Sequence, residues 1–159
     1  MRKLVNHVAM CLCVFVFALC ASVSSAQPSD PMVGTWQLNL AKSKYPTPAP
    51  KSMTLTVAPA AKGWAITVDA VGPDGQAQKW GYTSTFDGSE SPVSGNPNID
   101  AAVFRSTDTG GMVEYKKGGK VVSTTSSTIS DDGKTMTVTV KVSDAQGKEV
   151  TIVSVYDRQ

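Results

Sequence analysis

Hydrophobic and polar side chains alternate along most of this chain, and the clearest case is the run of residues 130–143. Every second residue from Met136 to Val142 is apolar, and threonine or lysine occupies the positions between them. Successive side chains of a β-strand point to opposite faces of its sheet, so this period of two predicts a half-buried strand. The preceding residues 131–133, Asp-Asp-Gly, favour a tight turn, because glycine accepts a positive φ and aspartate bonds to the local backbone.

The same unit, a turn rich in Gly and Asp followed by an alternating run, recurs along the chain. Residues 41–51 contain three prolines, which disfavour helix and predict an extended connection. Residues 89–100 are rich in proline, glycine and asparagine and predict a long loop with a short strand near Val93. The expected strands cover residues 33–40, 52–57, 64–68, 77–86, 101–107, 112–117, 120–130, 135–142 and 149–157.

This pattern predicts an all-β fold, and no segment shows a sustained helical period. Short turns join sequential strands, which favours antiparallel up-and-down order. An open sheet exposes two edges, and closure into a barrel removes them. We therefore expect an antiparallel β-barrel of about 8–10 strands. The alternative is a β-sandwich, in which the two long connections would cross between sheets.

The first 26 residues have the features of a cleaved signal peptide. Arg2 and Lys3 precede an apolar run, and small residues end at Ala26, as signal peptidases require. We expect residues 1–26 to be removed and residues 27–159 to form a single domain in the periplasm or outside the cell. The alternatives are an uncleaved N-terminal anchor and a lipid anchor on Cys20; after cleavage, no transmembrane anchor is expected.

Removal of the signal changes the chemistry available to the chain. All three cysteines lie within residues 1–26, as does the only histidine, His7. The remaining chain then excludes Ser-His-Asp and Cys-His catalysis and the usual zinc sites. It also has 13 basic and 13 acidic residues (15 − 2 = 13 basic, acidic unchanged at 13) and a net charge of zero, which argues against nucleic-acid binding.

Carboxylates are the remaining groups that could support catalysis or bind a metal. Most aspartates sit at turns, where a structural role suffices, so we expect no enzymatic activity, no cofactor and no metal. A carboxylate-based hydrolase remains an alternative. A metal site near Asn96, Asn98 and Asp100 is a weaker alternative than a turn-forming role for that loop.

Six aromatic residues on the expected strands are the candidates for a binding site. They either fill the barrel as a core or line a cavity in which tyrosine hydroxyls supply the polar contacts. The serine- and threonine-rich residues 123–130 fit either an outer face or a wet cavity lining. Arg105 is expected on the outer face, or else as a buried anchor for an anion. The six candidates are Trp36, Trp80, Tyr82, Phe104, Tyr115 and Tyr156.

Two ends of the chain resemble a known superfamily. Residues 34–38, GTWQL, resemble the G-x-W opening of the calycins, which include the lipocalins and the fatty-acid-binding proteins. Residues 152–157, IVSVYD, look like the closing strand of the fatty-acid-binding branch. The fatty-acid binders hold the ligand carboxylate with an Arg two residues before the closing Tyr, where this chain has Ser154. The resemblance implies a barrel with a cavity for an apolar or amphipathic small molecule, without that carboxylate clamp.

A broader likeness is to small exported bacterial lipocalin-like proteins, most of them uncharacterised. It rests on residues 34–44, 50–56, 82–96 around the run SPVSGNP, and 132–139. Together these features predict a monomeric, non-enzymatic, exported carrier of a small apolar or amphipathic ligand. The alternative is an envelope or extracellular interaction domain without a ligand cavity, which would have a filled core and an exposed apolar patch.

Overall fold

A computed structural model describes residues 30–46, 48–107, 110–143 and 147–159 of the protein. The expected signal peptide and Cys20 therefore lie outside the described residues. A short 3₁₀ helix, η1 (Leu40–Lys42), is the only helix of the described part. The strands are β1 (Gly34–Leu38), β2 (Ser52–Ala60), β3 (Gly63–Val71), β4 (Ala77–Thr85), β5 (Glu90–Pro92), β6 (Ala101–Thr107), β7 (Gly110–Lys117), β8 (Lys120–Ile129), β9 (Thr135–Ser143) and β10 (Glu149–Arg158).

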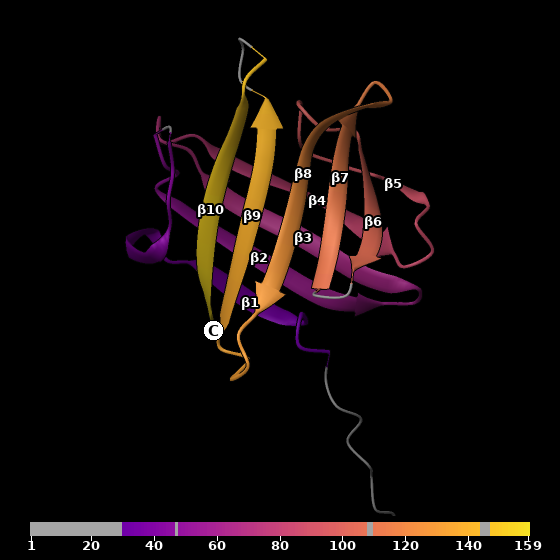
Figure 1. The fold of residues 1–159 in the computed structure, drawn as a ribbon, viewed down its shortest axis with the longest axis horizontal. Helices are drawn as coiled ribbons and strands as arrows, with labels where there is room; N and C mark the ends of the chain where they lie inside the picture. Colours follow the sequence, from indigo (N-terminus) through magenta and orange to yellow (C-terminus); the bar gives the residue numbers. More distant parts are fainter. Residues whose placement is uncertain (1–29, 47, 108–109, 144–146) are drawn as a thin grey trace, which may run out of the picture.

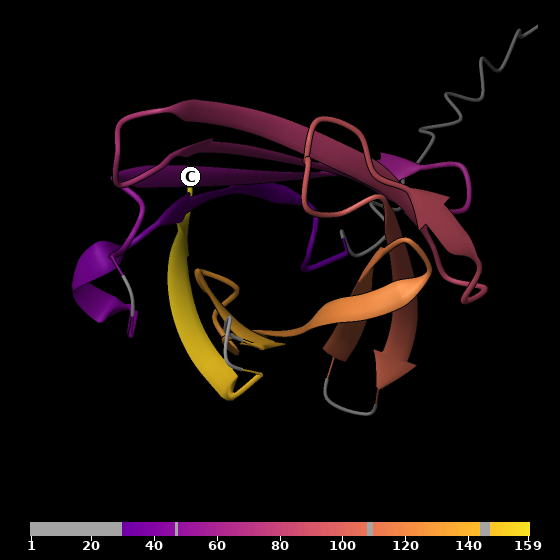
Figure 2. The same cartoon turned by 90° about the horizontal axis from the view of Figure 1, so that it is seen from above.

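These ten strands form one antiparallel sheet in the order β4-β3-β2-β1-β10-β9-β8-β7-β6-β5. Sequential strands are neighbours except β4 and β5, which lie at the two ends of this order, and the first strand pairs with the last through Trp36 and Arg158 at one end of the ladder. Figures 1 and 2 show β1–β4 crossing β6–β10 at a steep angle, with the sheet wrapped around one interior. The predicted up-and-down barrel is confirmed, and the sandwich alternative is wrong, because one sheet contains every strand.

The barrel closes between β4 and the segment after β5 through a short seam. The backbone amide of Gly81 donates to the carbonyl of Ser94, and Ser94 returns the bond, each at 3.0 Å. Gly95 follows with a φ of 81°, and a side chain there would collide with the backbone of Lys79. A single pair of backbone hydrogen bonds therefore closes the barrel at this seam, whereas neighbouring strands of the sheet are joined by ladders of three or more residue pairs.

Arg158 ties the end of the barrel where β1 and β10 meet. Its guanidinium lies 4.1 Å from the centre of the Trp36 ring. Its Nε donates to the carbonyl of Gly133 at 2.6 Å, and its Nη1 donates to that of Val33 at 2.7 Å. Its Nη2 bonds the carbonyl of Pro31. One side chain thus holds the N-terminal lead-in, the β8–β9 turn and the last strand together.

The structure confirms one local prediction and corrects two. The short strand expected near Val93 is present and covers Glu90–Pro92. Residues 41–51 include the end of η1, whose N-cap Asn39 accepts a bond from the amide of Lys42, so this connection is not extended throughout. The fourth strand ends at Thr85 and leaves Phe86 half exposed beyond it.

Candidate functional site

A cavity of about 290 Å³ lies inside the barrel. Inward-facing side chains of β2, β3 and β4 form one wall, and those of β7, β8, β9 and β10 form the wall across from it. Register explains why these side chains meet. Leu55 lies opposite Val68, and Val68 lies opposite Trp80, so each alternating run presents its apolar set to the same interior.

Three aromatic side chains form a cluster on this lining. Trp80 and Tyr82 stack with ring centres 6.3 Å apart, and Tyr115 meets both rings edge-on at 5.8 Å. The hydroxyl oxygens of Tyr82 and Tyr115 are 3.1 Å apart and share a hydrogen bond. The cluster joins β4 to β7 across the interior and places two hydroxyls there.

These tyrosines are held in the neutral form. Burial raises the pKa of Tyr82 to about 12, although the bond from Tyr115 acts in the opposite direction. Burial also raises the pKa of Tyr115 well above its usual value, with the neighbouring Tyr82 adding to the effect. Burial likewise raises the pKa of Tyr156. At neutral pH all three phenols keep their proton and can donate it to a hydrogen-bond acceptor.

A second polar cluster involves the proline-containing connection between β1 and β2. Lys44 forms an isolated bridge with Val153 of β10. The bridge brings Tyr45 to the cavity, where its hydroxyl lies 2.7 Å from that of Ser154. Nearby, the hydroxyl of Tyr156 donates to the sulfur of Met53 at 2.9 Å.

The serine- and threonine-rich strand β8 contributes to the cavity lining. Ser123, Thr125 and Ser127 face the cavity, while Thr124 between them lies opposite Glu114 and Lys141 in the ladders. No described residue forms a hydrogen bond with the side-chain hydroxyl of Ser123, Thr125 or Ser127. Of the two interpretations of this segment, the cavity lining holds for these three positions.

Of the six aromatic candidates, five line the cavity, namely Trp80, Tyr82, Phe104, Tyr115 and Tyr156. Trp36 does not. Its ring is fully buried beneath Arg158, and its Nε1 donates to the carbonyl of Met32 at 3.0 Å. The alternation of hydrophobic and polar residues correctly placed Trp36 on the inward face of its strand. Because Trp36 lies at the end of the barrel, it packs beneath Arg158 and does not line the cavity.

Sequence reasoning missed three contributors. Tyr45 lies on a segment without periodicity, so nothing in its neighbourhood indicates which way it points. Met53 and Ser154 belong to alternating runs, and their parity could have placed them inside. Arg105 is exposed on the outer face, where its Nη2 lies 3.2 Å from a carboxylate oxygen of Glu114, so it is not a buried anion anchor.

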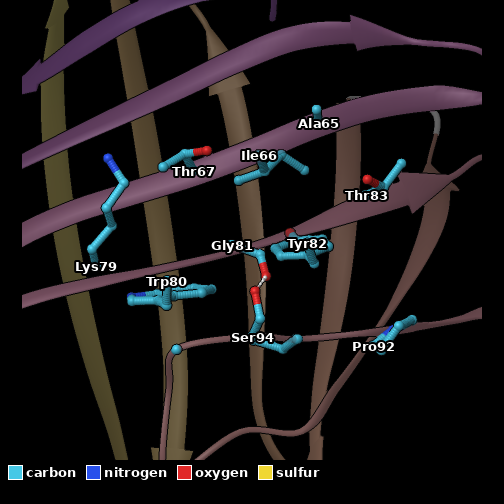
Figure 3. A pocket seen from close by; sticks show the side chains of 12 residues that line it. Ala65, Ile66, Thr67, Lys79, Trp80, Gly81, Tyr82, Thr83, Pro92 and Ser94 are labelled. Atoms are coloured by element: carbon cyan, nitrogen blue, oxygen red, sulfur yellow. Dashed lines mark hydrogen bonds between the residues drawn. The ribbon is translucent and has the colours of Figure 1, made fainter.

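Three further hollows adjoin the cavity. One, of about 550 Å³, lies beside the proline-containing connection and shares Tyr45, Met53 and Ile152 with the cavity. A second, of about 650 Å³, lies at the end near the N-terminal lead-in and shares Trp64 and Phe104. The third, also about 650 Å³, borders the seam; Figure 3 shows Trp80 and Tyr82 flanking the contact between Gly81 and Ser94.

The carboxylates of the strands serve structural contacts. Asp69 pairs with Lys79 at 3.0 Å, and Asp157 pairs with Lys42 at 3.0 Å. In the 93–100 loop, Asn96 accepts a bond from the amide of Asn98, and Asp100 from that of Gly118. No group of three or more metal-ligating His, Cys, Asp or Glu side chains occurs among the described residues.

No helix in the described part of the chain is long and apolar enough to cross a membrane.

Comparisons with known proteins gave one similar fold. No family model matches the sequence, and no curated protein matches it. The chain is similar to the crystal structure of zebrafish ileal bile acid-binding protein complexed with cholic acid, with a TM-score of 0.49 and 10% sequence identity. The similarity covers 82% of this chain and 100% of that one.

Proposed function

We propose that this protein is a non-enzymatic carrier or binding protein for a small apolar or amphipathic molecule, exported by the signal peptide at residues 1–26. The observation that carries the proposal is the cavity of about 290 Å³ inside the barrel. A barrel with a filled core has no such space, since protein interiors leave few voids larger than a water molecule.

The chemistry of the lining supports the same proposal. Ligand pockets are lined mainly by apolar and aromatic side chains, with a small number of polar groups that fix orientation. Here the apolar part comes from residues such as Leu55, Val57 and Val68, and the polar part comes from hydroxyls such as those of Tyr45 and Tyr115. The volume is close to the lower limit of about 300 Å³ for ligand sites, which favours a compact ligand over a long acyl chain.

Native mass spectrometry of the protein tests the proposal. The full chain, with its signal sequence, is expressed in a bacterial host, and the processed protein is purified from periplasm and medium without detergent. We expect a folded protein that carries a co-purifying small molecule, or that takes one up from a panel of neutral and anionic apolar compounds with a rise in melting temperature. A ligand that binds only the folded state must raise its apparent stability.

Two results would contradict the proposal. A ligand-free mass together with an unchanged melting temperature across the whole panel would favour the interaction-domain alternative. Retention of residues 1–26 in the cytoplasm would refute export alone and leave binding to be judged by the panel.

A further inference from the structure

The interior of the barrel has two chemically different walls. On β2 and β3 the inward side chains include Leu55, Val57, Ile66 and Val68, which are purely hydrocarbon. On β8 the inward side chains at positions 123, 125 and 127 all end in hydroxyls. A compact molecule in this space therefore meets hydrocarbon on one side and a row of hydroxyls on another.

The hydroxyl row can serve a ligand because the protein does not use it. Within the described chain no residue forms a hydrogen bond with the hydroxyls of Ser123, Thr125 and Ser127. Alternate residues of a strand are about 6.6 Å apart, so the row extends over roughly 13 Å of the cavity wall. Each hydroxyl offers one donor and two acceptor sites, and a group with both capacities can bind a ligand hydroxyl or carbonyl.

The tyrosine pair extends this polar edge. Tyr115 lies directly opposite Ser123 in the β7–β8 ladder, and strands in a ladder are about 4.8 Å apart. The bond between Tyr82 and Tyr115 uses one of their two hydroxyl protons. The other proton and the spare lone pairs remain available to a ligand.

The same lining disfavours charged ligands. Every described residue that borders the cavity is uncharged. Burial of a carboxylate without a cationic partner costs several kcal/mol. The hydroxyl of Ser154, which also borders the cavity, is already bonded to that of Tyr45. The cavity thus provides hydrogen bonds but no charge to compensate an anion.

We propose that the cavity selects uncharged, compact molecules that carry hydroxyl or carbonyl groups along one edge and hydrocarbon along the other, with β8 and the Tyr82–Tyr115 pair as the specificity-determining wall. The cavity equals the volume of roughly ten water molecules at about 30 Å³ each, so the ligand is of the size of a small fused-ring phenol. This inference rests on the proposed function and narrows its ligand class.

Two probes built on the same naphthalene ring system test it by isothermal titration calorimetry. The probes are 2,7-dihydroxynaphthalene, which has two hydroxyls on one edge, and 2-naphthoate, which is an anion at neutral pH. We expect the diol to bind at least tenfold more tightly than the naphthoate. A Thr125→Val substitution keeps the side-chain shape and removes one hydroxyl, so it should weaken diol binding by about threefold to tenfold.

The matched control is Thr124→Val, which changes the neighbouring side chain on the opposite face of the same strand. It should leave diol affinity within twofold of the wild type. Tyr115→Phe provides a second inner variant in case Thr125→Val does not fold, and circular dichroism with a melting curve verifies each variant.

The outcomes separate this inference from the proposed function. Naphthoate binding as tight as that of the diol, or diol affinity unchanged in both inner variants, would overturn the selectivity while leaving a binding protein. Failure of both probes to bind the folded wild type at millimolar concentration would also overturn the inference. In that case the mass-spectrometric search would still decide whether the protein binds some other molecule.

Discussion

Replacement of Arg158 by methionine tests whether this side chain holds together the end of the barrel where β1 and β10 meet. The guanidinium bonds three backbone carbonyls, two of them at 2.6 and 2.7 Å, and covers the buried ring of Trp36 at 4.1 Å. Methionine keeps an unbranched apolar stem but provides no donors and no charge. The variant thus removes the contacts that join the lead-in, the β8–β9 turn and the final strand.

The expected cost follows from these contacts. A hydrogen bond from a charged group contributes about 1.5–3 kcal/mol, and a cation over an aromatic ring about 0.5–2 kcal/mol. The contacts share one side chain and are not additive, and the freed carbonyls regain some hydration. We therefore expect a loss of about 3–4 kcal/mol in the free energy of unfolding. With an m-value of about 2 kcal/mol/M, that loss lowers the urea midpoint by about 1.5–2 M.

Urea unfolding followed by tryptophan fluorescence measures this loss. Arg105→Met is the matched control, because Arg105 forms an exposed ion pair with Glu114, and such pairs contribute about 0–1 kcal/mol. Arg158→Lys should lose most of the stability as well, since one ammonium cannot reproduce the planar fork. An Arg158→Met variant within 1 kcal/mol of the Arg105→Met variant would refute the role given to this residue.

Two further predictions concern the seam and the buried phenols. Gly95→Ala should destabilise the fold by about 2–4 kcal/mol and speed hydrogen exchange at the amides of Gly81 and Ser94, because Gly95 has a φ of 81° and a Cβ there collides with the backbone of Lys79. Gly119→Ala is the control, and it should cost only about 1–2 kcal/mol, because Gly119 has a φ of 76° but open space around it. Equal losses of stability in the two variants would contradict the crowding at the seam. Burial raises the pKa of Tyr82 from its usual value of 10.0 to about 12, which means that the folded state retains the phenol proton more strongly than the unfolded state. Its contribution to stability is therefore complete below pH 10 and declines as pH rises toward 12. Urea unfolding at pH 8, 10 and 11 should show this decline, which should be smaller in Tyr82→Phe; an identical pH dependence in the two proteins would contradict it.

Alternation in the sequence was sufficient to place most of the site. The alternation along β4 places Trp80 and Tyr82 on the inward face, and the alternation along β7 does the same for Tyr115. Parity identifies a face but not a position along the barrel axis. Trp36 lies on the inward face of its strand, as a core residue does, yet β1 places it at the end of the barrel where β1 and β10 meet and where Arg158 covers it.

Other features depend on contacts between distant segments. Tyr45 lies on the connection after η1, and its position comes from the bridge between Lys44 and Val153, more than a hundred residues apart. The hydroxyls of β8 fit a wet outer face or a wet interior equally well by sequence. Only the sheet order, which places β8 across the interior from β2 and β3, determines that three of them face the cavity.

A crystal structure of the protein with 2,7-dihydroxynaphthalene would show whether the barrel interior binds such a ligand. We expect the diol inside the barrel, with its hydroxyls within hydrogen-bonding distance of β8 or of Tyr115 and its rings against Leu55 and Val68. Density for the diol only on the outer surface, at saturating concentration and with the interior filled by rearranged side chains, would contradict it.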